Sequence, residues 1–341
     1  MVINEAFQHS VFAACFCLMI CAVSISMIPS TKEHLTQRKS ICFILGEDKE
    51  DQEYYSLATE FFQGDSVAKT DELIKHVRSI EELLHFLNRN PKAEPWARIE
   101  LVVHGNVWSG LSVNILDGGE RAYPKELLKA SIKNKLPLIN SNVIDSKTIV
   151  NVWGCGIGTN PVMNIALAKC FTDEIGNKAT LNSSKKFIVF KRQPSSGQVR
   201  LVKASYWPYF FKRGYRPSKS IIAKSLQEQF PNATVNFRDA VLHKNHSSTI
   251  QESFHIPVSW TVIYDTKEDR PTVRKQDEKI NWIKSQKQLM KNIEEFGIPF
   301  DRYQWTVNKI KHTDDYGNTV PAIKAIGMST VYCVLKEDRS V

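Results

Sequence analysis

Three short apolar segments, each followed within two residues by a glycine, constrain the fold of this 341-residue chain most strongly. They are Ser40–Leu45, Ile99–Val103 and Thr148–Trp153. Each has the length of a buried strand, and helical patterns lie between them, for example over Glu50–Phe62. Strands that alternate with helices predict a mostly parallel sheet covered by helices on both faces.

The region after residue 250 follows a different pattern. It predicts a strand over Val258–Tyr264, one amphipathic helix over Lys279–Phe296, and further strands over Tyr303–Val307 and Ile323–Leu335. The expected organisation is therefore a hydrophobic leader over residues 1–30, an α/β domain over 39–250 and a C-terminal α+β extension over 251–341.

The leader contains an uncharged apolar segment, Val11–Ile28, and Glu5 is the only Asp, Glu, Lys or Arg residue before it. Positive residues follow it, at Lys32, Arg38 and Lys39. This asymmetry favours a membrane anchor with the folded domain in the cytoplasm, and membrane association through residues 11–28. Two alternatives remain: a cleaved signal peptide, with a secreted or periplasmic domain, and initiation at Met27, which removes the segment.

Charge and cysteine usage exclude several classes of function. The net charge of +9, from 45 Lys+Arg and 36 Asp+Glu, is spread along the chain, which favours a solvated surface and no nucleic-acid partner. Three of seven cysteines lie in the apolar leader, and the others form no Cys-x-x-Cys or Cys/His pattern. We therefore expect no metal, no cofactor and no disulfide framework, with a reducing compartment.

Two strand ends carry reactive side chains. His104 follows the apolar segment Ile99–Val103 and precedes Gly105, and Cys155 follows Thr148–Trp153 between two glycines. Carboxyl ends of parallel strands meet at one edge of a sheet, which is where open α/β folds bind ligands. The two residues are therefore predicted to lie close together.

A thiol beside an imidazole is the nucleophile-plus-base arrangement of covalent catalysis. The backbone N–H groups of Gly105 and Cys155 are candidates to bind an oxyanion. The helix expected from Pro161 would lower the pKa of an accessible Cys155 thiol. Taken singly, each residue has a structural interpretation, since a strand-end His is commonly structural and a strand-side Cys packs as a small apolar group.

The blocks Ile99–Gly105 and Ile149–Cys155 resemble the His-Gly and Cys motifs of caspase-like (clan CD) cysteine peptidases. The Asp117–Gly119 turn and the helix after it lie between the two motifs, which resembles the usual order of elements in that group. The resemblance implies a caspase-like three-layer sandwich over residues 39–250. It also implies a cysteine endopeptidase with His104 as general base and Cys155 as nucleophile, acting on a protein or peptide substrate. The residues around Cys155 are closer to CHAT-, clostripain- or separase-like forms than to true caspases.

Two other functional hypotheses are compatible with parts of the sequence. An α/β-hydrolase is disfavoured because Trp153 and Ile157 occupy positions where a nucleophile elbow needs small residues. A catalytically inactive caspase-like interaction module, tethered to a membrane, is the alternative to the peptidase, because Gly156 and Ile157 replace polar residues often found after the Cys. The segment 182–200 is a candidate site of proteolytic processing in the peptidase interpretation.

Overall fold

The apolar segments form a five-stranded sheet in the computed structural model, which describes residues 38–49, 52–64, 68–89, 94–242, 249–313 and 317–338. In spatial order its strands are β2 (Glu72–Ile74), β1 (Ser40–Leu45), β3 (Arg98–Val103), β6 (Ile149–Trp153) and β7 (Thr180–Ser183). Every neighbouring pair in this sheet is parallel. The predicted α/β class with a mostly parallel sheet is confirmed.

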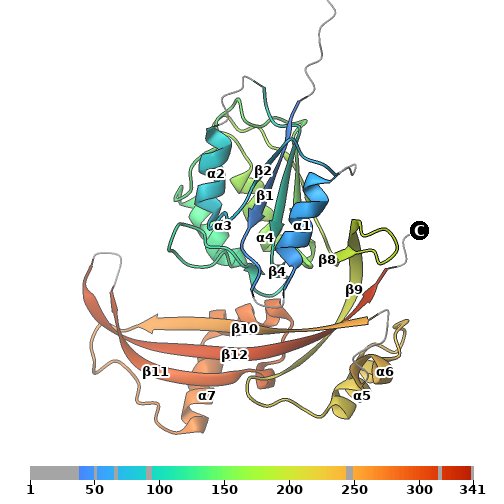
Figure 1. Ribbon diagram of the computed structural model, residues 1–341. Helices are drawn as coiled ribbons and strands as arrows, with labels where there is room; N and C mark the ends of the chain where they lie inside the picture. Colours follow the sequence, from blue (N-terminus) through green and yellow to red (C-terminus); the bar gives the residue numbers. More distant parts are fainter. Residues whose placement is uncertain are drawn as a thin grey trace, which may run out of the picture. The chain divides into compact units, whose positions relative to one another are not determined.

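Alternate side chains of this sheet enter two different hydrophobic clusters. On β1, Phe43 and Leu45 pack with three helices, α2 (Ile80–Asn88), α3 (Pro124–Ile132) and α4 (Pro161–Cys170). Cys42 and Ile44 point to the other face and pack with α1 (Tyr54–Gln63). Figure 1 shows α1 on one side of the sheet and α2 and α3 on the other. The sheet is therefore covered by helices on both faces, as the sequence predicts.

Side chains fix where these helices begin. The Ser79 hydroxyl accepts a hydrogen bond from the Glu82 N–H at 3.0 Å and caps α2. Asn160 caps α4 in the same way, accepting from the Met163 N–H at 3.0 Å. The helix predicted from Glu50 begins at Tyr54 instead. The carboxylate of Asp48 explains the later start, because it accepts the Tyr55 and Ser56 N–H groups at 2.8 Å each.

A second, antiparallel sheet follows in the chain. Its order is β10 (Thr249–Ile263), β12 (Thr319–Glu337), β9 (Val199–Lys212) and β8 (Phe187–Arg192), with β11 (Gln304–Thr313) also paired to β12. A separate two-stranded hairpin joins β4 (Gly105–Asn106) to β5 (Gly110–Leu111).

Both faces of the second sheet also carry helices. Val331 and Cys333 of β12 share a hydrophobic cluster with α7 (Gln276–Ser285) and α8 (Lys287–Phe296). Tyr332 and Val334, on the opposite face, pack with α5 (Lys219–Gln229) and α6 (Phe237–Leu242). Of the aromatic residues of β9, Tyr209 and Phe211 are buried in this core, and Tyr206, Trp207 and Phe210 pack against it while partly exposed.

The second sheet begins earlier in the chain than the sequence suggested. Two of its strands, β8 and β9, precede residue 250, and β10 starts at Thr249, so the predicted boundary at 250/251 falls inside a strand. Residues 38–341 form one compact unit. The long pairing between β10 and β12, from Thr249↔Lys336 to Ile263↔Ala322, joins residues on both sides of that boundary.

The single helix predicted over Lys279–Phe296 is two helices, α7 and α8, separated at Gln286. Gln286 has ψ 85°, which is not helical. The hydroxyl of Ser285 and the amide of Gln286 both donate to the Trp282 carbonyl, at 2.7 and 3.1 Å. Side chains therefore satisfy a carbonyl that a continuous helix would pair with a backbone N–H.

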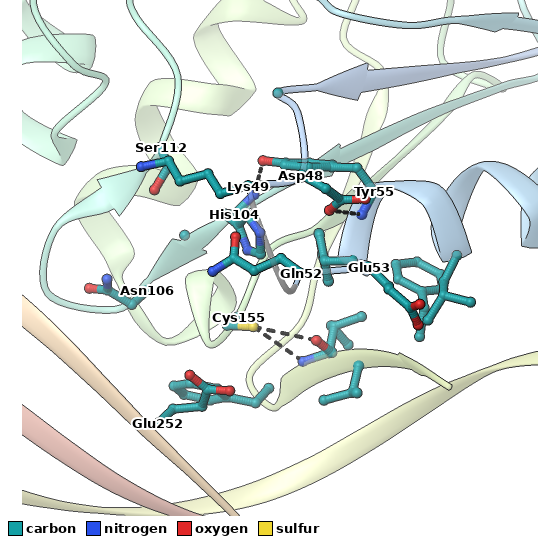
Figure 2. A pocket seen from close by; sticks show the side chains of 18 of the residues that line it. Asp48, Lys49, Gln52, Glu53, Tyr55, His104, Asn106, Ser112, Cys155 and Glu252 are labelled. Atoms are coloured by element: carbon teal, nitrogen blue, oxygen red, sulfur yellow. Dashed lines mark hydrogen bonds between the residues drawn. The ribbon is translucent and has the colours of Figure 1, made fainter. Parts of the chain in front are cut away.

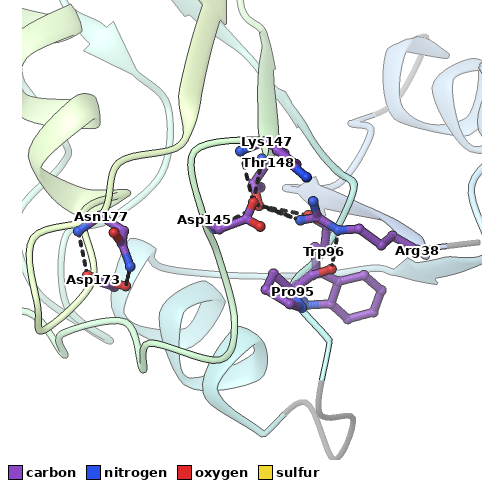
Figure 3. A network of polar contacts seen from close by, with 8 residues as sticks. All are labelled: Arg38, Pro95, Trp96, Asp145, Lys147, Thr148, Asp173 and Asn177. Atoms are coloured by element: carbon purple, nitrogen blue, oxygen red, sulfur yellow. Dashed lines mark hydrogen bonds and ion pairs between the residues drawn. The ribbon is translucent and has the colours of Figure 1, made fainter. Parts of the chain in front are cut away.

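Arg38 ties together the amino-terminal ends of the parallel strands (Figure 3). Its guanidinium donates to the Trp96 carbonyl at 2.5 Å, and to Asp145 and the Thr148 hydroxyl at 3.0 Å each. Trp96 precedes β3 and Thr148 precedes β6, so one side chain joins three strand starts. Arg38, interpreted from sequence as a topology signal, thus has a structural role in the fold.

The predicted hydrophobic leader and its Val11–Ile28 segment lie outside the described residues. In the part of the chain that the structure describes, no helix has both the length and the apolar character needed to cross a bilayer.

Candidate active site

The topology brings His104 and Cys155 to the same edge of the parallel sheet. β3 and β6 are neighbours, and Val102 pairs with Trp153 at their carboxyl ends. His104 and Cys155 each follow two residues later, just beyond the ends of β3 and β6. Both side chains line one cavity of about 1330 Å³. The structure therefore has the carboxyl ends of β3 and β6 side by side, as the sequence predicts.

Glycines allow the chain to turn at both strand ends. A Cβ on Gly105 would lie 2.9 Å from the Gly110 carbonyl oxygen and 3.0 Å from Ile157. Gly156, directly after Cys155, has φ +67°, a left-handed conformation that L side chains rarely adopt. Gly105 also lines the cavity, next to His104.

His104 is enclosed by aromatic rings of α1. The Tyr54 ring stacks on the imidazole with centroids 4.2 Å apart, and the Tyr55 ring meets it edge-on at 4.7 Å. Burial lowers the pKa of His104 below its ordinary value, Asp48 opposes this shift, and Lys49 adds to it. The imidazole is thus predominantly neutral at pH 7, the form that accepts a proton. Its Nε2 is buried and has no hydrogen-bond partner among the described residues.

Hydrogen bonds hold α1 against the strand ends. The Tyr54 hydroxyl donates to the Trp153 carbonyl at 2.8 Å, and the Tyr55 hydroxyl donates to the Leu45 carbonyl at 3.0 Å. The Tyr55 hydroxyl also accepts a hydrogen bond from the backbone N–H of His104 at 3.0 Å. The first turn of α1 is therefore fixed to the ends of β1, β3 and β6, beside both candidate residues.

Cys155 is engaged with the backbone of β8. Its thiol donates to the Ile188 carbonyl, and the Ile188 N–H donates to the sulfur, both at 3.5 Å (Figure 2). Burial raises the pKa of the thiol to about 12, and the negative charge of Glu252 adds to this effect. The sequence predicted an accessible thiol with a lowered pKa. Cys155 is partly exposed, but its pKa shifts in the opposite direction, because the sulfur packs against the backbone of β8 and because the short helix Ile157–Thr159 separates Cys155 from α4.

A buried carboxylate supports the strand that carries Cys155. Glu100 of β3 is 2% exposed, and it accepts hydrogen bonds from the Trp153 indole at 2.6 Å and the Asn151 amide at 3.1 Å. Arg98 lies 2.7 Å from the same carboxylate. These contacts join β3 to β6 just before His104 and Cys155, so they fix the relative position of the two strand ends.

Most residues that line the cavity are not predicted as site residues by the sequence, and Tyr54, Ile188 and Glu252 are among those that act on Cys155 or His104. The sequence pattern around Tyr54 predicts a helix, and the pattern around Ile188 predicts a strand. Glu252 lies in a region whose role the sequence left open. Only the pairing of distant segments places these side chains beside Cys155.

Within the described residues, no group of three or more His, Cys, Asp or Glu side chains could hold a metal ion. Cys42, Cys155, Cys170 and Cys333 are free thiols.

Comparison with family models, curated proteins and solved structures gives no match to this chain. The chemistry of the site is therefore inferred from its residues and their geometry.

Proposed function

We propose that this chain is a cysteine endopeptidase of the caspase-like type, with Cys155 as nucleophile and His104 as general base. The observation that carries the proposal is that both residues follow paired positions of adjacent parallel strands and line one cavity. A neutral imidazole beside a thiol is the arrangement that covalent acyl transfer requires. The cavity is large enough for several residues of an extended peptide.

The edge of β8 offers a place for the peptide backbone. β8 pairs with β9 on one side and is the last strand of its sheet. Ile188 directs its N–H and C=O toward Cys155, away from β9, so both groups lie on the unpaired edge of β8. Residues 187–190 all line the cavity. A peptide that adds to this edge as a strand would have its backbone beside the thiol.

The reaction begins when the Cys155 thiol leaves Ile188 and turns toward His104. The imidazole takes the thiol proton, and the sulfur attacks the peptide carbonyl carbon. The N–H groups of Gly105 and Cys155 are the candidate donors to the resulting oxyanion. The imidazolium then gives its proton to the departing amine, and water hydrolyses the thioester to release the acid and the free thiol.

The proton transfer is unfavourable in the arrangement described. The thiol pKa is about 12 and the imidazole pKa is lowered, so the proton stays on sulfur. Each unit of that gap costs about 1.4 kcal/mol. The structure therefore corresponds to a resting state in the peptidase hypothesis, and binding of a peptide along β8 is expected to displace the thiol from Ile188.

The same observation favours the second candidate function, a caspase-like interaction module without catalysis. In that case Cys155 is a structural thiol that is hydrogen-bonded to Ile188 of β8, and the cavity binds a peptide without cleaving it. The membrane tether considered for such a module depends on residues 11–28, which the structure does not describe.

The two functions separate in a cleavage assay with the full-length chain and a mixed peptide library. Cys155→Ala is compared with Cys170→Ala, which removes a buried thiol at the end of α4. The peptidase hypothesis predicts at least about a 10³-fold loss of cleavage for Cys155→Ala alone. Equal cleavage by both variants would exclude Cys155 as the nucleophile, and no cleavage by the wild type would favour the interaction module.

A further inference from the structure

The amino-terminal edge of the parallel sheet exposes large apolar side chains. Among the described residues, three of the four most exposed are Ile175, Ile132 and Leu138, with exposed fractions of 72%, 58% and 57%. Ile132 ends α3, Leu138 lies between α3 and β6, and Ile175 lies between α4 and β7. Helices that connect parallel strands return the chain to this edge, opposite the candidate site. Three such side chains at one edge indicate an interaction surface.

The two connections that carry Leu138 and Ile175 are fixed to each other. The backbone of Ile139 forms a bridge with that of Asp173, and the Glu174 N–H donates to the Ile139 carbonyl at 2.9 Å. The Asp173 carboxylate accepts the Ile175 N–H at 3.0 Å and also holds the turn that follows (Figure 3). The exposed apolar side chains are therefore presented by one ordered surface.

Lysines of the same two connections surround these side chains. Lys133, Lys135 and Lys178 are exposed, and none of them forms an ion pair with a residue that the structure describes. Exposed lysines around exposed apolar side chains suit a partner surface that is both apolar and negatively charged. We define the docking face by six residues: Ile132, Leu138, Ile175, Lys133, Lys135 and Lys178.

The acidic residues of the two connections do not neutralise the docking face. The Asp145 carboxylate pairs with the Arg38 guanidinium at 3.0 Å. Asp173 is buried and is bound by backbone N–H groups. Glu174 is the exposed one of the three, and it accepts a backbone N–H at 3.3 Å. The docking face therefore carries a positive excess.

The described chain begins at this same edge, with Arg38. The apolar segment Val11–Ile28, which the sequence predicts as a membrane anchor, ends ten positions before Arg38. Ten residues reach at most about 35 Å when extended, so an anchor in a bilayer keeps this edge close to the lipid headgroups. The folded domain is expected on the cytoplasmic side, whose leaflet carries anionic lipids.

We propose that the docking face rests on the surface of a bilayer that contains anionic lipids. Its three apolar side chains enter the boundary between headgroups and acyl chains, and its lysines bind the lipid phosphate and carboxylate groups. Each lysine close to such a surface strengthens binding about fivefold. The proposal does not depend on the peptidase proposal. It orients the molecule, because the carboxyl edge of the sheet and the cavity then face away from the bilayer.

Photocrosslinking in the full-length chain tests the docking face directly. p-Benzoylphenylalanine replaces Leu138 or Ile175, and in the matched control it replaces Ile221, which is 53% exposed on α5. The vesicles contain phosphatidylcholine with phosphatidylserine, or phosphatidylcholine alone. Mass spectrometry should find at least about tenfold more lipid adduct at Leu138 and Ile175 than at Ile221 in the anionic vesicles. Without phosphatidylserine the adduct should fall at least about threefold.

Two triple variants that lower the net charge equally test the lysines. The first removes those of the docking face: Lys133→Gln/Lys135→Gln/Lys178→Gln. The second removes three exposed lysines of β9 and of the loop after β10: Lys203→Gln/Lys212→Gln/Lys267→Gln. The first should reduce the lipid adduct at Leu138 at least about fivefold, and the second should leave it unchanged. Circular dichroism and thermal melting check that both variants are folded.

Three results would overturn the proposal. The first is equal lipid adduct at Leu138, Ile175 and Ile221. The second is a loss of adduct in the docking-face variant that is no greater than in the control variant. The third is an adduct to protein in place of lipid, which would mean that a second copy or the leader covers this face. Lipid adduct confined to the docking face supports the proposal whether or not the chain cleaves peptides.

Discussion

The Tyr54 ring stacks on the imidazole of His104 with centroids 4.2 Å apart and an interplanar angle of 27°. The same side chain donates a hydrogen bond to the Trp153 carbonyl, two residues before Cys155. One residue of α1 therefore contacts the imidazole and the strand that carries the thiol. Its ring and its hydroxyl have separable roles, and two substitutions distinguish them.

Tyr54→Phe keeps the ring and removes the hydrogen bond to Trp153, so it should destabilise the fold by about 1 kcal/mol and leave the pKa of His104 unchanged. Tyr54→Ala removes the cover from the imidazole, so the pKa of His104 should rise toward its ordinary value of about 6.5. NMR titration of the His104 ring measures its pKa in both variants, and urea unfolding measures the stability of Tyr54→Phe. Equal His104 pKa values in the wild type and in Tyr54→Ala would show that the ring does not desolvate the imidazole.

The stability of the fold should fall in mildly acidic solution because of His104. Burial lowers the pKa of His104, so below about pH 6.5 the unfolded chain binds a proton that the folded chain does not. The stabilising contribution is complete above that pH and is lost as the pH falls toward the folded-state pKa. Urea unfolding of the wild type and His104→Gln across pH 5–8 measures it, and parallel pH profiles for the two proteins would contradict the assignment.

The thiol of Cys155 should be unreactive in the absence of a peptide. Because its pKa is raised to about 12, alkylation by iodoacetamide at pH 8 should be slower than that of free cysteine by roughly 10²–10³-fold. A peptide that displaces the thiol from Ile188 should accelerate the reaction. Mass spectrometry of the alkylated protein gives the rate at Cys155. Alkylation as fast as that of free cysteine would mean that the contacts with β8 do not persist in solution.

The Arg38 network should be a major contribution to stability at the edge of the sheet opposite the candidate site. Arg38→Met leaves Asp145 and two backbone carbonyls without their charged donor, and should cost about 1.5–3 kcal/mol. The matched control is Lys224→Met, which breaks an exposed pair with Glu228 and should cost less than about 0.5 kcal/mol. Urea unfolding compares them, and equal losses would mean that the network adds nothing beyond a surface ion pair.

The sequence predicts the parallel sheet and the adjacency of the two strand ends because both follow from local patterns. Apolar segments such as Ile99–Val103 locate strands, and parallel strands necessarily end at one edge. His104 and Cys155 are found from those rules alone. Their common cavity is a consequence of strand order, which the alternation of strands and helices already suggests.

The environment of the site depends on contacts that no local pattern contains. Glu252 and Ile188 lie on strands of the antiparallel sheet, and the pairing of residues far apart in the chain positions them beside Cys155. The raised pKa of Cys155 follows from that coverage, whereas a short segment of sequence shows only the glycines beside it. The break between α7 and α8 is also absent from the helical pattern. At this break the Ser285 and Gln286 side chains, and not a backbone N–H, donate to the Trp282 carbonyl.

We propose that Cys155 and His104 act together on a peptide carbonyl. A panel of peptidyl acyloxymethyl ketones, varied in the residue beside the ketone, tests it on the full-length chain, because an activated thiol displaces the carboxylate and forms a stable thioether. Peptide mapping by mass spectrometry should find the thioether at Cys155, with Cys42, Cys170 and Cys333 unmodified, and His104→Ala should slow labelling at least about 10²-fold. Labelling of Cys155 at the same rate in His104→Ala, or no labelling of Cys155 by any member of the panel, would contradict the claim.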